Sequence, residues 1–181
     1  MKYSIAAALA ATLLASGQAS AFELASPDMK DSGTLKIEQV ANVFGCKGGN
    51  VSPALSWKDA PEGTKSFVVT LYDPDAPTGS GWWHWTVFDI PASAKSLPSG
   101  AGSTGGTGLP SGAIQGRTDF GTSGFGGACP PPGPAHRYKL TVTALKVDKL
   151  GLDSNASGAL VGYMTQANAL ASASITATYG Q

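Results

Sequence analysis

Two strand-forming segments, separated by a short polar stretch, constrain the fold of this chain more than any other feature. Residues 65–72, Lys-Ser-Phe-Val-Val-Thr-Leu-Tyr, are apolar almost without interruption, which predicts a central strand buried on both faces. Residues 85–90 form a second such segment, and Pro91 ends it. Between them, residues 73–84 carry two carboxylates, two prolines and a histidine, which predicts a loop. Functional sites concentrate on loops that a rigid sheet holds in place, so this loop is the first candidate.

The rest of the chain adds further strands to this pattern. Residues 35–40 and 137–145 alternate apolar and polar side chains, which predicts two strands, the second with one face toward solvent. Residues 50–57 lead into a short strand, and residues 174–179 form a last one. Turn-forming residues are abundant, with 24 Gly and 12 Pro, and only 13% of the residues are charged. This composition indicates an ordered, mainly β sandwich rather than a disordered chain, because apolar residues stay plentiful.

One helix and one long loop complete the expected architecture. Residues 155–173 place apolar side chains at three-to-four spacing, and Asn155 or Ser157 can cap them, which predicts a helix. Residues 98–127 are dense in glycine and show little pattern. A disordered linker between two domains is one interpretation of this segment. Bulky residues such as Phe120 favour a long ordered surface loop instead, and loops of this length are often functional.

The N-terminus has the pattern of a secretory signal peptide. Lys2 gives it a positive start, residues 5–15 are a short Ala- and Leu-rich run, and an Ala-Ser-Ala motif fits cleavage after Ala21. A membrane anchor is the alternative, but a spanning helix needs about 20 apolar residues and this run is much shorter. We therefore expect a signal peptide over residues 1–21, a single domain over residues 22–181, and a periplasmic or secreted protein.

The charge balance excludes one class of partner. The chain has 12 basic and 12 acidic residues, and the basic ones form no cluster or stripe. A nucleic-acid-binding surface requires such a stripe, so no nucleic-acid partner is expected. No stretch after the signal peptide is apolar enough to span a bilayer, so no membrane span is expected either.

The chain has two cysteines, Cys46 and Cys129. In an exported protein an even number of cysteines predicts disulfide bonding, and two cysteines allow only one intramolecular pair. Such a bond would close a loop of about 80 residues and contribute about 4 kcal/mol through the entropy of the unfolded chain. Two free thiols or an intermolecular bridge are the alternatives. An oxidising compartment argues against a further option, a nucleophilic Cys129 thiolate.

Four polar side chains converge if the predicted strands are neighbours in one sheet. Asp73 and Asp75 follow the end of one strand, and the two histidines of the chain, His84 and His136, precede two others. Imidazoles and the backbone N–H groups of residues 126–127 are donors suited to an anion such as phosphate. The two carboxylates would accept from an amine or orient the imidazoles. Aromatic residues would supply apolar walls: Trp82, Trp83, Trp85 and Phe125.

Each of these residues also has a structural interpretation. Asp73 and Asp75 flank a proline and would cap a turn. His84 would be a packed imidazole, His136 would be exposed in a proline-rich loop, and the tryptophans would be core or rim packing. Two histidines and two carboxylates can hold zinc, but the chain has no His-x-His or His-x-x-x-His pair. A serine hydrolase of the usual kind would need a Gly-x-Ser-x-Gly turn, which the sequence lacks.

The sequence resembles the phosphatidylethanolamine-binding protein family, which includes the Raf kinase inhibitor proteins, and is most similar to its bacterial YbhB/YbcL branch. The motifs include Asp-Pro-Asp-Ala-Pro from Asp73, Trp-His-Trp around His84, and His-Arg-Tyr from His136. Their order and spacing agree with the family over residues 42–145, with weaker likeness near the C-terminus. The full set comprises residues 50–57, 67–77, 83–85, 116–121, 126–131 and 136–138.

The resemblance implies a β-sandwich of a large antiparallel sheet and a smaller one, with one or two short peripheral helices near the C-terminus. It also implies a small pocket at one sheet rim that accepts phosphate, a carboxylate or a phosphoryl-ethanolamine group. Family members are mostly regulators and binders, so no catalytic residue, metal ligand or cofactor is expected. By position, the ligand-binding residues would be Asp73, Asp75, His84, Gly126, Gly127, Pro130, His136 and Tyr138.

The sequence departs from the eukaryotic members in two respects. The segment between Asp75 and His84 is short, and the long C-terminal helix of animal members has no counterpart. The pocket mouth would therefore be more open, or free for a second subunit, and a homodimer is one expectation.

The resulting hypothesis is an exported, non-enzymatic binding protein for a small anion, with a regulatory role as an option. A metal-dependent or other hydrolase that uses the same Asp/His cluster is the first alternative. A secreted protein-interaction factor with a vestigial pocket is the second.

Overall fold

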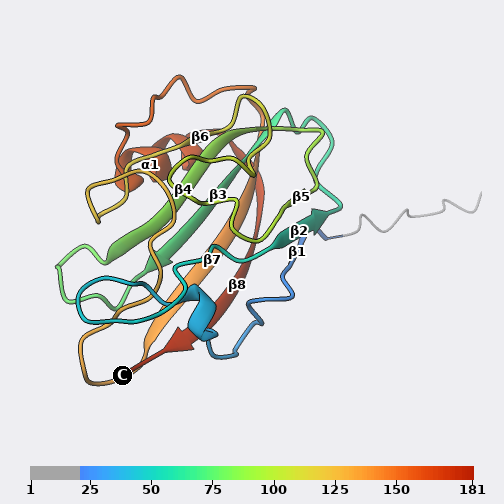
Figure 1. The fold of residues 1–181 in the computed structure, drawn as a ribbon. Helices are drawn as coiled ribbons and strands as arrows, with labels where there is room; N and C mark the ends of the chain where they lie inside the picture. The colour runs from blue at the N-terminus through green and yellow to red at the C-terminus, as the bar shows by residue number, and fades with distance from the viewer. Residues whose placement is uncertain (1–20) are drawn as a thin grey trace, which may run out of the picture.

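The structure is a computed structural model that describes residues 21–181, so all but the last residue of the predicted signal peptide lies outside the described residues. Its elements form two antiparallel sheets, one long helix and one short 3-10 helix (Figure 1). In chain order they are β1 Glu23–Ala25, η1 Ile37–Gln39, β2 Leu55–Lys58, β3 Ser66–Asp73, β4 Trp82–Pro91, β5 Ser96–Leu97, β6 Ile114–Gln115, β7 His136–Leu145, α1 Gly158–Asn168 and β8 Ala169–Tyr179.

The larger sheet has five strands in the order β6-β4-β3-β7-β8, and the smaller has three in the order β1-β2-β5. In the larger sheet, β3 lies at the centre and pairs antiparallel with both β4 and β7. The three strands that carry the candidate residues are therefore direct neighbours. The end of β3 and the starts of β4 and β7 lie at the same rim of the sheet, as the sequence predicted.

Strand β3 is buried on both faces, which confirms its predicted central position. On the inner face, Phe67 and Leu71 belong to the main core, and the Phe67 ring lies 5.3 Å from the ring of Trp57 in the smaller sheet. On the outer face, Val68 packs in a second cluster with Val161 of α1. This double burial explains why the run of apolar residues is continuous rather than alternating.

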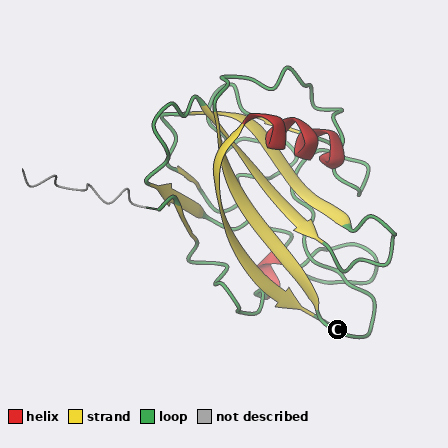
Figure 2. Cartoon of the chain, turned by 180° about the vertical axis from the view of Figure 1, so that it is seen from behind, coloured by secondary structure: helices red, strands yellow, loops and turns green. Residues whose placement is uncertain are grey.

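Helix α1 lies across one end of the outer face of the larger sheet (Figure 2). Ser157 caps it as predicted, since its hydroxyl accepts a hydrogen bond from the N–H of Leu160. The helix approaches the sheet closely at two glycines. A Cβ atom on Gly158 would lie 2.2 Å from Cγ of Trp83, whereas one on Gly162 would lie 3.3 Å from the far edge of the same indole.

We expect Gly158→Ala to lower the free energy of unfolding by about 1–3 kcal/mol, because the added methyl group collides with the base of the Trp83 side chain. Gly162→Ala is the matched control. At Gly162 the added methyl group makes only a slightly close contact with the indole of Trp83. Its cost is offset by the helix propensity of alanine, which is roughly 1 kcal/mol more favourable than that of glycine. Urea denaturation of both variants measures the difference. Equal destabilisation by the two substitutions would contradict the close packing of α1 on Trp83.

The prediction of a strand over residues 35–40 is wrong, because this segment contains η1. At its start, the N–H of Leu35 donates to the carbonyl of Thr178 in β8. Further along, its backbone groups bond to loops: the N–H of Gly49 donates to the carbonyl of Ile37, and that of Ala128 to the carbonyl of Gln39. The apolar and polar alternation of this segment reflects these tertiary contacts, in which Val40 is buried and Ile37 is exposed.

The predicted helix over residues 155–173 is too long at its C-terminal end. Helix α1 ends at Asn168, and residues 169–173 begin β8, which pairs with β7 from Ala169 opposite Leu145. Ala and Ser residues fit either a helix or a strand. Here they form a strand, because the edge of β7 is available for backbone hydrogen bonds. Within residues 21–181, no helix has the length and apolar character needed to cross a bilayer.

Strand β4 begins at Trp82, three residues before the predicted start, so His84 lies in a strand and not in the loop. His136 likewise is the first residue of β7. The long glycine-rich loop over residues 98–127 is ordered, as predicted, and contains β6. Two buried residues, Ala101 and Phe125, anchor it to the core.

Candidate functional site

A β-bulge in β4 directs His84 toward the rim. Trp83 pairs with Tyr72 and Trp85 with Leu71, so two steps along β4 match one step along β3 and His84 is the extra residue. Bulges of this kind re-aim a side chain and are common beside functional sites. Here Trp85 enters the core while the ring of His84 lies 5.2 Å from that of Tyr138.

Asp73, the last residue of β3, uses both of its carboxylate oxygens. Oδ1 accepts hydrogen bonds from the N–H groups of Asp75, at 2.8 Å, and Ala76, at 3.1 Å. Oδ2 lies 2.8 Å from Nδ1 of His136 and accepts a hydrogen bond from that ring N–H. The turn-capping and imidazole-orienting interpretations of Asp73 are therefore both correct. His136 is buried, in contrast to the alternative of an exposed loop histidine.

His84 is held by backbone carbonyls instead of by a carboxylate. Its Nδ1 lies 2.8 Å from the carbonyl oxygen of Gly126 and 3.1 Å from that of Gly127. Burial lowers the pKa of His84, an effect that the hydrogen bonds to Gly126 and Gly127 and the charges of Asp73 and Asp119 oppose. His84 is therefore neutral at neutral pH, with its proton on Nδ1.

The two glycines contribute differently from the prediction. The N–H of Gly126 donates to the carbonyl of His84 at 2.8 Å, and that of Gly127 donates to Oδ1 of Asn50 at 2.7 Å. Their N–H groups are thus occupied and are not free to bind an anion. Asn50 also donates from Nδ2 to the carbonyl of Phe125 at 3.3 Å, so it fixes the segment that positions His84.

These side chains border a cavity of ≈ 170 Å³, which we call the rim cavity. Two residues that line it each carry a buried donor with no hydrogen-bond partner among the described residues: the hydroxyl of Tyr138 and Nε1 of Trp82. Burial also raises the pKa of the Tyr138 hydroxyl, which stays protonated. Of the eight predicted ligand-binding residues, five line the cavity: Asp73, His84, Pro130, His136 and Tyr138.

The sequence did not identify one wall of the rim cavity. Phe44 and Phe120 line it, and their rings stack with centroids 6.1 Å apart. Trp82 lines it as predicted, and its ring meets Phe120 edge-on at 5.3 Å. The other three predicted wall residues lie elsewhere: Trp83 packs under α1 and against Tyr72, whereas Trp85 and Phe125 are in the core. Strand alternation and the bulge separate them, and neither is visible in a list of aromatic residues.

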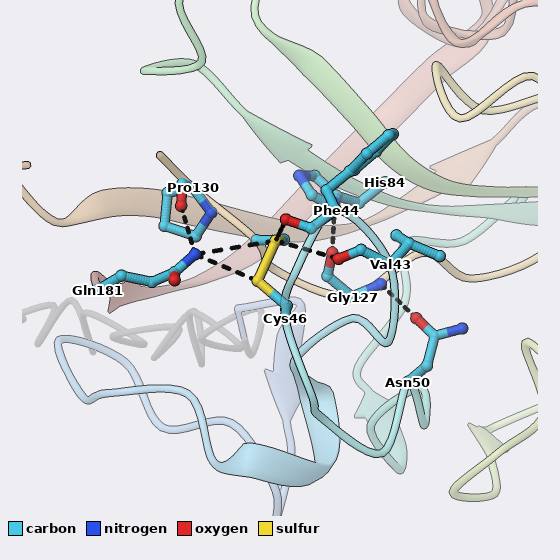
Figure 3. Close-up of a disulfide and its surroundings, with 9 residues drawn as sticks. Val43, Phe44, Cys46, Asn50, His84, Gly127, Pro130 and Gln181 are labelled. Atoms are coloured by element: carbon cyan, nitrogen blue, oxygen red, sulfur yellow. Dashed lines mark hydrogen bonds between the residues drawn. A yellow bond between two sulfur atoms is a disulfide. The ribbon is translucent and has the colours of Figure 1, made fainter. Parts of the chain in front are cut away.

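The predicted disulfide between Cys46 and Cys129 is present, and Cys129 lines the rim cavity. Figure 3 shows that it joins the segment that carries Val43 and Phe44 to the segment that continues into Pro130. The bond therefore fixes Phe44, an otherwise exposed side chain, beside the cavity mouth.

Asp75 faces away from the rim cavity and pairs with Arg137. Its Oδ2 accepts from the backbone N–H of Arg137 at 2.8 Å and from Nε at 2.9 Å, and its Oδ1 accepts from the guanidinium at 2.7 Å. The Arg137 side chain and backbone together lower the pKa of Asp75 from 3.8 to about 2. Asp75 thus braces the start of β7 and does not orient an imidazole.

We expect Asp75→Asn to lower the free energy of unfolding by about 1 kcal/mol at pH 7, a value reduced for the partial exposure of the pair. Because the folded-state pKa is depressed, this contribution is present above about pH 4 and is lost as the pH falls toward 2. Urea denaturation of the wild type and the variant at pH 7 and pH 2 measures both differences. A difference that persists at pH 2 would contradict the role of the Asp75 carboxylate.

The geometry bears on the metal alternative as well. Within the described residues, no three His, Cys, Asp or Glu side chains are grouped so that they could hold a metal ion. Asp73 and His136 bond to each other, and His84 presents its Nδ1 to carbonyl oxygens. The Asp/His cluster is thus linked internally and to the backbone.

The family model for the phosphatidylethanolamine-binding protein matches residues 25–180, which include every residue that lines the rim cavity. The UPF0098 protein YbcL of Escherichia coli K12 is 56% identical over 180 residues, covering 99% of this chain and 98% of the relative. The UPF0098 protein YbhB of the same organism is 53% identical over 157 residues, covering 87% and 99%.

Solved structures agree with the sequence comparison. The crystal structure of E. coli YbcL, described as a new member of the mammalian PEBP family, matches with a TM-score of 0.87 and 58% sequence identity. The match covers 88% of this chain and 98% of the YbcL chain. A putative PEBP homologue from Chlamydia trachomatis matches with a TM-score of 0.74 at 26% identity. The two-sheet sandwich is therefore shared well beyond the range of high sequence identity.

Proposed function

Because the chain belongs to the phosphatidylethanolamine-binding protein family and is of the YbcL/YbhB type, we propose that it is an exported, non-enzymatic protein that binds a small anion in the rim cavity. The anionic group is a phosphate, a phosphoryl-ethanolamine or a carboxylate. The observation that carries this proposal is the pair of buried donors without partners, the Tyr138 hydroxyl and Nε1 of Trp82. Buried donors in native proteins are nearly always satisfied, and an anion in the rim cavity would satisfy both.

The two imidazoles support the same ligand. Each has its Nδ1 bonded to the protein, so its Nε2 is left for a ligand in the rim cavity, which both rings line. The apolar part of the wall, including Phe44 and Phe120, suits an organic group attached to the anion. A small concave site with a few polar groups among apolar ones is typical of ligand binding.

Binding is favoured over hydrolysis by the state of the potential catalytic groups. A general base needs a free lone pair close to the proton that it removes, and both oxygens of Asp73 already accept hydrogen bonds. The Tyr138 hydroxyl stays protonated, because burial raises its pKa. These two groups thus suit recognition of an anion better than its chemical conversion.

NMR titration of the ¹⁵N-labelled protein with phosphate, O-phosphoethanolamine and acetate tests the proposal. We expect saturable shifts centred on His84 and His136, and about 10–100-fold weaker binding by Tyr138→Phe, which loses one hydrogen bond to a charged ligand. Lys139→Ala is the matched control, because Lys139 is an exposed cation next to Tyr138 on the opposite face of β7. The absence of saturable shifts up to about 10 mM ligand would contradict the proposal, since that exceeds the range of ordinary weak sites.

Export is supported by the signal-peptide pattern of the sequence and by the disulfide, which persists in oxidising compartments. Cell fractionation followed by mass spectrometry of the intact protein tests it. We expect a mature chain that begins at Phe22 and lacks two hydrogens, as the disulfide requires. Recovery of the unprocessed chain with reduced thiols would refute export.

A further inference from the structure

The two imidazoles at the rim cavity have different partners behind them. Nδ1 of His136 faces the Asp73 carboxylate at 2.8 Å, so a positive charge on this ring has a counter-charge in direct contact. Nδ1 of His84 faces only the carbonyl oxygens of Gly126 and Gly127. A buried charge is tolerated when it is paired, and it is costly when it is not. A second ring proton, on Nε2, is therefore paired with a counter-charge at His136 and is unpaired at His84.

The carbonyls fix the tautomer of His84. A carbonyl oxygen only accepts hydrogen bonds, so the ring proton must sit on Nδ1. In the neutral ring Nε2 then carries a lone pair and no proton. His84 thus presents an acceptor to the rim cavity, whereas the Tyr138 hydroxyl and Nε1 of Trp82 can act as donors.

The groups around His84 do not reverse this assignment. From β3 it faces Asp73, whose oxygens are both engaged, and from β7 it faces His136 and the neutral Tyr138. From the loop before β7, Asp119 acts on it at longer range while its Oδ2 accepts from the backbone N–H of Trp83 at 2.7 Å. Burial outweighs these charges, so the neutral ring is the resting state.

We propose that, among tetrahedral anions, the rim cavity prefers those that carry an acidic proton, so that it binds a phosphomonoester more tightly than a phosphodiester. The P–O–H group of a monoester monoanion donates to Nε2 of His84, while its other oxygens accept from the Tyr138 hydroxyl and from Nε1 of Trp82. A phosphodiester or sulfate has no such proton. Such a ligand places an oxygen lone pair against the lone pair on Nε2 of His84. The alternative is protonation of Nε2, which gives the buried ring a positive charge with no carboxylate in contact.

This selectivity rests on the proposed function, because it concerns the same cavity. Sites built to hydrogen-bond a particular ligand group strongly reject analogues that lack it, since a buried polar atom is then left unpaired. We therefore expect a preference of about 10–100-fold for the proton-bearing ligand at pH 6. Phosphomonoesters lose their second proton with a pKa near 6. The ratio of monoester affinity to diester affinity should therefore decrease steadily above about pH 7.

Two ligand pairs test the inference by NMR titration or calorimetry at pH 6 and pH 8. Phosphate against sulfate compares ions of the same tetrahedral shape with and without a proton. O-phosphoethanolamine against glycerophosphoethanolamine compares monoester with diester on the same amine. We expect the first member of each pair to bind at least tenfold more tightly at pH 6, and long-range ¹H–¹⁵N spectra to show His84 protonated on Nδ1 alone before ligand is added.

The outcomes separate this inference from the proposed function. Binding of all four ligands within about threefold would overturn the selectivity and leave anion binding standing. Protonation of both nitrogens of His84 in the free protein at pH 6 would overturn it as well. If none of the ligands bound, the proposed function and the selectivity would fall together.

Discussion

Removal of the disulfide by the double substitution Cys46→Ser, Cys129→Ser is expected to lower the free energy of unfolding by about 4.5 kcal/mol. The bond links residues 83 positions apart, and the chain-entropy relation for a loop of that size gives this value. For a domain of this length, the loss corresponds to a fall in melting temperature of about 10–15 °C.

The effect should reach the candidate site. The disulfide connects the segment before Cys46, which carries Phe44, to the start of the Pro130 segment. Without the bond, Phe44 keeps its ring contact with Phe120, but its side chain is largely exposed and is then less firmly positioned. We therefore expect weaker ligand binding in the double variant even at temperatures where it remains folded.

Calorimetry of the wild type with and without dithiothreitol provides the comparison. Full reduction of the wild type should reproduce the melting temperature of the double variant, and the reductant should not affect the variant itself. A fall of less than about 3 °C after verified reduction would contradict the assigned contribution, because the entropy term would then be almost absent.

Gly127→Ala is expected to destabilise the protein by about 3 kcal/mol or more and to disrupt the site at the same time. A Cβ atom here would lie 2.5 Å from the backbone N of Ala41 and from the carbonyl oxygen of Gln39. Neither can withdraw easily, because the N–H of Ala41 donates to Ala128 at 2.9 Å and Gln39 accepts from Ala128 at 3.1 Å. Overpacking against backbone costs more than overpacking against a side chain that can rotate.

Gly126→Ala is the informative control for this prediction. Its Cβ would meet the ring of Phe120, at 2.3 Å, and that ring is a side chain that can move. We expect a smaller loss of stability than for Gly127→Ala, together with altered ligand affinity, because Phe120 is part of the cavity wall. Urea denaturation and a phosphate titration of both variants measure the two effects. A milder effect of Gly127→Ala than of Gly126→Ala would contradict the packing described here.

Much of the fold could be predicted from local patterns. The double burial of β3 follows from its continuous apolar run, and the order of motifs along the chain identified the family correctly. The errors lie where local pattern is ambiguous. Residues 169–173 are mostly small and fit a helix or a strand, and residues 35–40 alternate like a strand although their backbone bonds mainly to loops. In both places, partners distant in the sequence made the choice.

Five of the eight predicted ligand-binding residues line the rim cavity, whereas the hydrogen bonds predicted for the other three differ from those in the structure. Asp73, His84 and His136 were identified as a convergent set, and the neighbouring positions of β4, β3 and β7 bring them together. The sequence also suggested that Asp75 would face the ligand and that the 126–127 segment would donate its N–H groups. The structure assigns Asp75 to Arg137 and turns the glycine carbonyls toward His84.

The sequence by itself determined which chemical groups are available: two imidazoles, a buried carboxylate and a pair of cysteines near the ends of strong strands. Only the tertiary structure decided what each group offers. The reason is that a histidine is a donor or an acceptor according to what its other nitrogen contacts. For His84 those contacts are the carbonyl oxygens of Gly126 and Gly127, which follow it in the chain by 42 and 43 positions. No local pattern around Trp-His-Trp records them, and the bulge that aims the ring depends on the register with β3.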